Sequence, residues 1–330
     1  MTEQSSLPSD DVLLRVDDLA VAFATEKGDA LAVDGVSFAL KKGEVLSLVG
    51  ESGCGKSATA MSVLRLIPSP PGRIARGSVI FTGQNLTTMR ERDLRRIRGN
   101  RIGMVFQEPM TALNPVFRIG DQIAEPLRTH RGMSKAEAWG RAAALLDEVG
   151  IPEAERRLRD FPHQLSGGMR QRVMIAMAVA CEPELVIADE PTTALDVTVQ
   201  NQVLHLLTRL TRDRGNSLLL ITHDLGVVAE TADRVAVMYS GKIVEEARVG
   251  ELFAAPSHPY TQGLMRSRPR MDPSARYERL PSIPGVVPGP LARPEGCAFR
   301  DRCPIAVELC LTPPPNKELA PDHYCRCHLA

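Results

Sequence analysis

Residues 50–57 constrain the fold of this chain more than any other feature of its sequence. They match the pattern G-x-x-x-x-G-K-[ST], with a strand candidate at 45–49 before them and a helix-compatible run at 58–66 behind them. Glycines let the backbone curl so that N–H groups face an anion, Lys56 adds a positive charge, and Ser57 offers a hydroxyl to Mg²⁺. The alternative is a glycine-rich turn that only caps a helix, but the strand–loop–helix context favours phosphate binding.

We assign this loop and the residue after it to nucleotide binding. Cys54 stands at a variable position of the pattern, and we expect it to fill space rather than to take part in redox chemistry. The assigned residues are Gly50, Glu51, Ser52, Gly53, Cys54, Gly55, Lys56, Ser57 and Ala58.

The apolar pattern of the chain predicts an α/β fold. Later strand candidates alternate with helix-like segments, which favours a parallel sheet covered by helices. Residues 116–159 have helical spacing and predict an inserted helical subdomain. Prolines thicken after residue 251, notably over 281–290, and predict a C-terminal appendage joined by a loop-rich linker. The strand candidates are 12–23, 32–40, 45–49, 102–106, 185–188 and 218–222.

The composition is that of an ordinary globular protein. Among 330 residues, 40 Lys and Arg balance 40 Asp and Glu, so a bulk electrostatic attraction for nucleic acid is disfavoured. No apolar run approaches the roughly 18 residues that span a bilayer. Residues 1–11 are polar and acidic, unlike a secretory leader. We therefore expect a cytosolic protein.

Two adjacent carboxylates follow the apolar run 185–188. The carboxyl end of a strand is where ligands bind in open α/β sheets. Asp189 is expected to hold the Mg²⁺ shell, and Glu190 to orient and deprotonate the attacking water. Gln107, just after a strand candidate, is expected to reach the metal and the water, and His223 the terminal phosphate. Taken alone, each of these residues also fits an ordinary polar loop position.

A second anion site is predicted at Ser166, Gly167 and Gly168. Ser166 is a good N-cap for the helix-like run that follows, and the glycines leave N–H groups bare at the positive end of the helix dipole. By itself this is also a simple capped helix. Since one nucleotide hardly needs two phosphate cradles in one domain, we expect this element to complete the site of a neighbouring subunit.

Taken together, these motifs resemble those of ABC-type ATPases, over roughly residues 12–260. The loop at 50–57, Gln107, residues 165–169, residues 185–190, Ala194-Leu195-Asp196 and His223 occur in the order of that family. The resemblance implies two nucleotide domains arranged head to tail around ATP. It also implies that Phe23 stacks on adenine and that Asp196 lies at the dimer seam. Met169 stands where many relatives have Gln. This difference does not affect Ser166, Gly167 or Gly168.

Three further segments resemble the ATP-binding subunit of dipeptide and oligopeptide permeases: residues 106–115, residues 258–261 and the cysteine-rich stretch 296–328. This resemblance implies ATP hydrolysis coupled to peptide import, with nickel or glutathione as alternative solutes. It implies a second, related but non-identical ATPase subunit, two transmembrane permease subunits and an extracytoplasmic solute-binding protein, and no nucleic-acid partner. The chain is then expected at the cytoplasmic face of the cell membrane as a peripheral subunit.

The expected architecture is an ABC-type P-loop nucleotide-binding domain with an antiparallel β subdomain, an inserted helical subdomain and a Cys-rich C-terminal appendage. We place an N-terminal tail at 1–11, the ATPase domain at 12–250 with the helical subdomain at about 113–168, and the extension at 251–330. A soluble ABC ATPase that acts on nucleic acid or ribosomes is the competing class, but the sequence has one phosphate loop, no long heptad stretch and no basic excess. A regulatory protein that only holds ATP is disfavoured by Glu190 and His223.

Five of the seven cysteines crowd the C-terminal stretch. Cys297, Cys303, Cys310 and Cys327 offer four thiolates, and their spacing leaves an iron–sulfur cluster, zinc or metal-free thiols open. Cys325 competes with Cys327 for the last position. The resemblance to peptide-permease ATPases implies a [4Fe-4S] cluster on Cys297, Cys303, Cys310 and Cys327, with a structural role.

Overall fold

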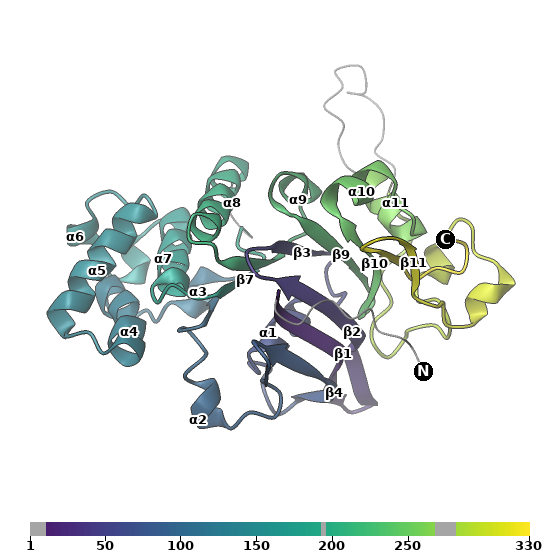
Figure 1. Cartoon of the computed structure of the whole chain (residues 1–330), viewed down its shortest axis with the longest axis horizontal. Coiled ribbons are helices and arrows are strands. Elements are labelled where there is room, and N and C mark those ends of the chain that lie inside the picture. Colours follow the sequence, from purple (N-terminus) through teal and green to yellow (C-terminus); the bar gives the residue numbers. More distant parts are fainter. Residues whose placement is uncertain (1–10, 193–195, 268–281) are drawn as a thin grey trace, which may run out of the picture. The chain divides into compact units, whose positions relative to one another are not determined.

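The computed structural model describes residues 11–192, 196–267 and 282–330 (Figure 1). These residues belong to two compact units. Of the described residues, the first unit holds 11–13, 40–45, 88–192 and 196–221, and the second holds 14–39, 46–87, 222–267 and 282–330. The domain boundaries expected from the sequence, at residue 250 and at about 113–168, stay predictions.

Three parallel strands form the sheet of the first unit. β6 (Ile102–Val105), β7 (Leu185–Asp189) and β8 (Ser217–Ile221) lie in the order β8-β7-β6. Every residue of β7 and β8 is buried. Parallel strands that are covered on both faces have this uniformly apolar character. The predicted parallel sheet is confirmed in these strands.

Helices make up most of the chain between β6 and β7. α4 (Ile119–Arg131) and α5 (Lys135–Glu148) pack against each other and against α7 (Gly167–Val179), as Figure 1 shows. Ser134 and Glu137 form a capping box that fixes the start of α5. The other helices of this unit are α2 (Glu91–Leu94), α3 (Pro109–Ala112), α6 (Ala154–Arg157), the short η1 (Pro162–Gln164) and α8 (Val197–Arg212).

Two sheets form most of the second unit. One is antiparallel, in the order β2-β1-β4-β5, and confirms the antiparallel β element expected near the N-terminus. The other has the order β11-β12-β10-β9-β3, in which β3 and β9 pair in parallel. The strands are β1 (Val12–Thr25), β2 (Gly28–Lys41), β3 (Val45–Val49), β4 (Gly72–Phe81), β5 (Gln84–Asn85), β9 (Arg234–Tyr239), β10 (Lys242–Arg248), β11 (Lys317–Ala320) and β12 (His323–Cys325).

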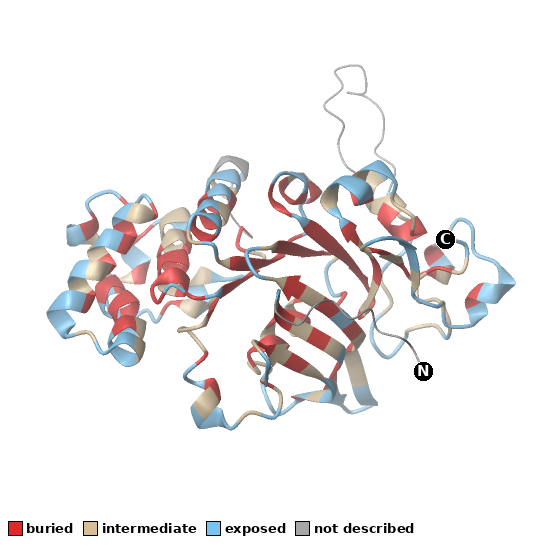
Figure 2. Ribbon diagram, in the orientation of Figure 1, coloured by how far each residue is buried: buried red, intermediate tan, exposed pale blue. Residues whose placement is uncertain are grey.

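The core of the second unit lies along β3 and β9. Every residue of these two strands is buried, which Figure 2 shows as continuous red ribbon. β3 leads directly into the phosphate loop, so the loop starts from a rigid support. The helices of this unit are α1 (Lys56–Val63), α9 (Leu225–Thr231), α10 (Val249–Ala254), α11 (Pro259–Arg266), η3 (Arg300–Arg302) and η4 (Glu308–Leu311).

The described part of the C-terminal extension, residues 251–267 and 282–330, belongs to the second unit. Strand β12 pairs with β10, so the extension continues the sheet. Residues 282–290 have no regular helix or strand, as their prolines predict. Pro259 stands at the first turn of α11, where its missing N–H costs nothing. The predicted loop-rich structure is confirmed for residues 282–290, and residues 268–281 of the predicted linker lie outside the described residues.

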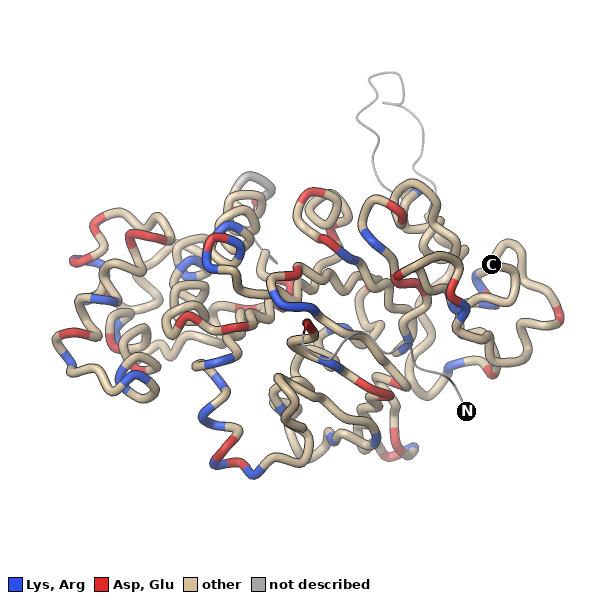
Figure 3. Tube along the Cα trace, in the orientation of Figure 1, with Lys and Arg blue, Asp and Glu red and all other residues tan. Residues whose placement is uncertain are grey.

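Charges of both signs are interspersed along the described chain (Figure 3). This distribution matches the net charge of zero. None of the helices in the described ranges is both long enough and apolar enough to cross a bilayer.

Candidate active site

The phosphate loop takes a conformation that requires glycine at its two ends. Gly50 has φ +152° and Gly55 has φ +106°. A Cβ at Gly50 would lie 2.3 Å from the carbonyl oxygen of Met238, and one at Gly55 would lie 2.6 Å from that of Ala32. Neither contact is possible without backbone movement, so only glycine lets the loop approach these strands.

Lys56 is buried and folds back onto the loop. Its Nζ donates hydrogen bonds to the carbonyl oxygens of Gly50, at 2.9 Å, and Glu51, at 3.1 Å. Gly55 is the N-cap of α1 and supplies no side-chain cap. Gly55 therefore supplies no side-chain acceptor to the first N–H groups of α1, and a helix start is the kind of element that binds phosphate.

The remaining residues of the loop differ in exposure. Ser52 and Gly53 are exposed, Ala58 is half-buried, and Cys54 is fully buried. Burial raises the pKa of the Cys54 thiol, and its Sγ lies 4.0 Å from the Nζ of Lys56. Both observations fit a residue that fills space.

Gln107 and Glu190 lie together in the first unit. The Nε2 of Gln107 donates a hydrogen bond to Oε2 of Glu190 at 3.2 Å. Asp189, the last residue of β7, is buried. Glu190 has φ +42°, and its N–H donates to the carbonyl of Ile221 at 2.9 Å. Backbone strain of this kind is typical of functional positions.

The predicted helix start at Ser166, Gly167 and Gly168 is also present in the first unit. Ser166 is the N-cap of α7, and its hydroxyl accepts a hydrogen bond from the N–H of Met169 at 3.3 Å. Ser166 and Gly167 are exposed, whereas a Cβ on Gly168 would lie 2.9 Å from the side chain of Val199. The start of α7 thus offers an accessible polar edge.

Three further candidates lie at the ends or edges of elements. Asp196 is the N-cap of α8 and accepts a hydrogen bond from the N–H of Val199 at 2.9 Å. His223 is exposed in the turn before α9, in the second unit. Phe23 is half-buried on β1, opposite Gly72. Ala194 and Leu195, which belong to the Asp196 motif, lie outside the described residues.

Four cysteine thiols of the extension interact electrostatically. Burial raises the pKa of Cys297 and Cys303, and the neighbouring thiols of Cys310 and Cys327 raise both further. Cys325 is fully buried on β12, opposite Glu245, and burial raises its pKa. Within the described ranges, no group of three or more His, Cys, Asp or Glu residues is close enough to hold a single metal ion. This arrangement supports neither a zinc site nor an iron–sulfur cluster on these residues.

Sequence reasoning missed the residues of the extension that contact the phosphate loop. The hydroxyl of Tyr260 accepts a hydrogen bond from the N–H of Glu51, and the guanidinium of Arg302 pairs with the carboxylate of Glu51. α11 holds Tyr260 in place through its N-cap, His258, whose Nδ1 accepts from the N–H of Tyr260 at 3.1 Å. Burial lowers the pKa of His258 to about 4, so it stays a neutral acceptor. No local pattern could signal contacts that span 209 and 251 residues.

Comparison with known proteins identifies the family. A probable peptide ABC transporter ATP-binding protein of Sinorhizobium fredii is 53% identical over 323 residues, which cover 98% of this chain and 96% of the relative. The chain belongs to the ABC transporter ATP-binding proteins. Residues 33–193 match the family described as ABC transporter, and residues 244–310 match the oligopeptide/dipeptide transporter C-terminal region.

Other members of the ABC family support this result over most of the chain. The oligopeptide transport ATP-binding protein OppD of Bacillus subtilis is 50% identical over 318 residues, which cover 96% of this chain and 88% of OppD. Among solved structures, the ATP-binding cassette MJ0796, a dimer in a post-hydrolysis state with ADP and Pi, has a TM-score of 0.65 and 29% identity. The matched region covers 72% of this chain and 98% of the MJ0796 chain. The chain is accordingly an ABC-type ATPase.

Proposed function

We propose that this ABC ATPase powers the import of dipeptides or oligopeptides. The observation that carries the proposal is the match of residues 244–310 to the oligopeptide/dipeptide transporter C-terminal region, a part of the chain outside the ATPase motifs. The relatives from Sinorhizobium fredii and Bacillus subtilis bear peptide or oligopeptide transport in their names. We place the chain at the cytoplasmic face of the membrane, where it binds two permease subunits. A solute-binding protein on the outside delivers the peptide to these subunits.

In the proposed active site, Lys56 and the N–H groups of the loop bind the phosphates. Ser57, Asp189 and Gln107 would hold Mg²⁺, because hydroxyl, carboxylate and amide oxygens are its preferred ligands. When bound, Mg²⁺ neutralises charge on the phosphate oxygens. Glu190 is the general base for the attacking water. The hydrogen bond from Gln107 orients the Glu190 carboxylate before water arrives. His223 and Phe23 are assigned to the terminal phosphate and the adenine.

A second ATPase subunit, related but not identical, completes each site in this proposal. Ser166, Gly167 and Gly168 of one subunit face the nucleotide held by the loop of the other, and Asp196 lies at the seam. Two features support this arrangement: the exposed polar edge at the start of α7, and the similarity to the dimeric structure of the cassette MJ0796. ATP then favours the closed dimer, and hydrolysis favours its opening.

We assign the permease contact to the segment that follows β6, which carries exposed apolar side chains. Large side chains are exposed there although they are of the type that folding usually buries. Val116 is 73% exposed, Met110 61% and Phe117 54%. These residues follow Gln107, so a contact with the permease is close in sequence to a residue of the active site. This proximity supports coupling of hydrolysis to transport.

Solute uptake tests the proposed function. Cells that lack this chain are expected to lose ATP-dependent uptake of a labelled tripeptide and to regain it when the chain is restored. Nickel and glutathione uptake, measured in the same cells, serve as controls for the alternative solutes. Intact peptide uptake together with lost nickel or glutathione uptake contradicts the peptide assignment while keeping the transporter class.

We also propose that Cys297, Cys303, Cys310 and Cys327 bind a structural [4Fe-4S] cluster. The match of residues 244–310 to the oligopeptide/dipeptide transporter C-terminal region supports the proposal, because it includes Cys297, Cys303 and Cys310. When bound, the cluster would cross-link separate turns of a segment that is poor in regular structure.

Metal analysis after anaerobic purification tests the cluster. We expect about four iron and about four sulfide per chain in the wild type. Cys303→Ser is expected to lose most of this iron, because it removes one thiolate, whereas Cys325→Ser is expected to keep it. A colourless protein with one zinc, or equal iron loss in both variants, would contradict the assignment.

A further inference from the structure

The C-terminal extension holds one residue of the phosphate loop, Glu51, by both its backbone and its side chain. The N–H of Glu51 donates to the hydroxyl of Tyr260 at 2.8 Å. Arg302 donates from Nη1 to Oε2 of Glu51 at 2.7 Å and from Nη2 to Oε1 at 3.0 Å. A bidentate pair fixes direction as well as distance, so the Glu51 side chain has a defined orientation.

Contacts other than those with Glu51 also hold the Arg302 side chain in place. Its side chain is only 6% exposed, and its Nε donates to the carbonyl of Pro284 at 2.8 Å. The guanidinium carbon lies 5.7 Å from the ring centroid of Tyr239 and 6.0 Å from that of Phe299. A planar guanidinium that is bonded at its edges and packed on its faces loses little further freedom when it binds a carboxylate.

Tyr260 is fixed by the same aromatic cluster. It is fully buried, and its ring centroid lies 4.7 Å from that of Tyr239 and 5.4 Å from that of Phe299. Tyr239 belongs to β9, whereas Tyr260 and Phe299 belong to the extension. The cluster therefore joins the sheet, the extension and the phosphate loop within the second unit.

Glu51 connects these contacts to the lysine of the loop. Its carbonyl oxygen, together with that of Gly50, accepts the hydrogen bonds of Lys56 Nζ. The position of the Glu51 peptide thus sets where the Lys56 ammonium rests. The Glu51 carboxylate also carries a negative charge in a loop that must bind a polyanion, and Arg302 neutralises that charge.

We propose that Arg302 and Tyr260 are positioning residues for nucleotide binding, which act through Glu51. Tyr260 holds the peptide that orients Lys56, and Arg302 neutralises the carboxylate of Glu51 within the phosphate loop. Nucleotide affinity consequently depends on the folded state of the extension. This inference rests on the proposed role of the loop in the second unit as the phosphate site.

A double-mutant cycle on the full chain tests this inference, with Mg-ADP affinity measured by calorimetric titration. Arg302→Met is expected to weaken affinity about tenfold or more, because it leaves a carboxylate unneutralised beside the phosphates. In a Glu51→Gln background the same substitution is expected to change affinity by less than about twofold. Tyr260→Phe removes a single hydroxyl and is expected to weaken affinity about threefold to tenfold, which keeps the test informative if Arg302→Met does not fold.

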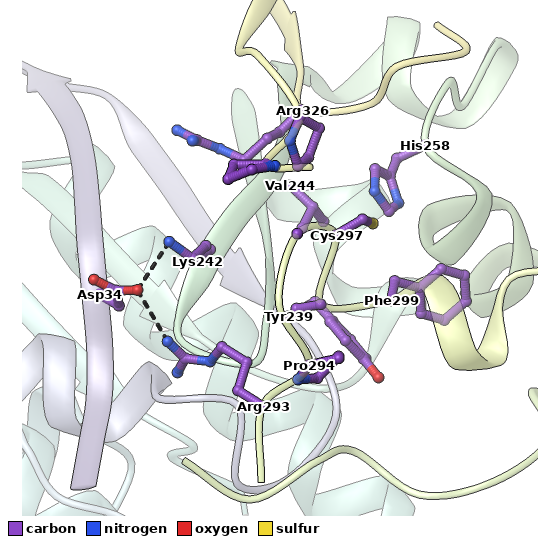
Figure 4. Close-up of a pocket in the computed structure, with 14 residues that line it drawn as sticks. Asp34, Tyr239, Lys242, Val244, His258, Arg293, Pro294, Cys297, Phe299 and Arg326 are labelled. Carbon is purple, nitrogen blue, oxygen red and sulfur yellow. Dashed lines mark hydrogen bonds and ion pairs between the residues drawn. The ribbon is translucent and has the colours of Figure 1, made fainter. Parts of the chain in front are cut away.

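Arg293→Met is the matched control. Arg293 is also a poorly exposed arginine of the extension, but it donates to Asp34 of β2 at 3.0 Å, beside a pocket that Cys297, His258 and Phe299 also line (Figure 4). It is expected to lower the melting temperature while changing ADP affinity by less than about twofold. Equal losses of affinity for Arg302→Met in both backgrounds, or for Arg293→Met and Arg302→Met, would show that Arg302 only stabilises the extension. A wild-type chain that binds no ADP would contradict the proposed phosphate site itself.

Discussion

Glu190→Gln is expected to bind ATP as tightly as the wild type and to hydrolyse it about a hundredfold to a thousandfold more slowly. General bases contribute rate factors of roughly 10² to 10⁴, and an amide cannot accept the proton of the attacking water. The amide keeps the size of the carboxylate. It also keeps an oxygen that can accept the hydrogen bond from Gln107. Phosphate release and nucleotide affinity, measured on the same preparation, separate the two effects.

The substitution is also expected to accumulate the ATP-bound dimer, since hydrolysis is what reopens it in the proposed cycle. Analytical size exclusion in the presence of Mg-ATP measures this species. Glutamine tolerates the φ of +42° at this position no worse than glutamate, so backbone strain is the same in both proteins.

Glu184→Gln is the matched control for Glu190→Gln. Glu184 directly precedes β7, where it pairs with Arg101 on the surface, with 2.6 Å between Nε and Oε1. An exposed pair of this kind contributes little to stability. Turnover is expected to stay within about twofold of the wild type. Undiminished hydrolysis in Glu190→Gln would instead show that another group takes the proton from water.

The elements that carry the nucleotide chemistry could be predicted because their signals are local. The phosphate loop occupies consecutive positions, and its strand and helix adjoin it in sequence. The strands before Gln107 and Glu190 were predicted from the apolar runs 102–106 and 185–188, and the carboxyl ends of parallel strands lie at one edge of a sheet. Both predictions used backbone geometry that short segments determine.

The contacts of the extension could not be predicted, because their signals are not local. Arg302 and Glu51 lie 251 positions apart, and neither residue stands in a pattern that names its partner. The prolines around residue 285 predicted irregular structure and gave no sign that β12, farther along the chain, pairs with β10. The tertiary structure decides such pairings, because burial of Tyr260 and Phe299 against Tyr239 brings the extension onto the loop.

Gly55→Ala is expected to weaken nucleotide affinity about a hundredfold or more. Displacement of binding groups by about 1 Å is sufficient for a loss of this size. A Cβ at Gly55 would lie 2.6 Å from the carbonyl oxygen of Ala32, which belongs to β2 and cannot move without its strand. The loop must shift instead, and Lys56 and Ser57 shift with it. Titration with Mg-ADP and unfolding in urea measure affinity and stability.

Gly28→Ala separates steric exclusion from backbone strain. Gly28 has φ +110°, close to the +106° of Gly55, but a Cβ there would meet nothing within 4 Å. Both substitutions carry the strain of a positive φ, about 1 to 3 kcal/mol, in the free energy of unfolding. Gly28→Ala is therefore expected to cost stability while ADP affinity stays within about twofold. If both variants lost affinity equally, strain alone would account for the effect. If Gly55→Ala bound ADP normally, the close approach of the loop to β2 would have no part in forming the phosphate site.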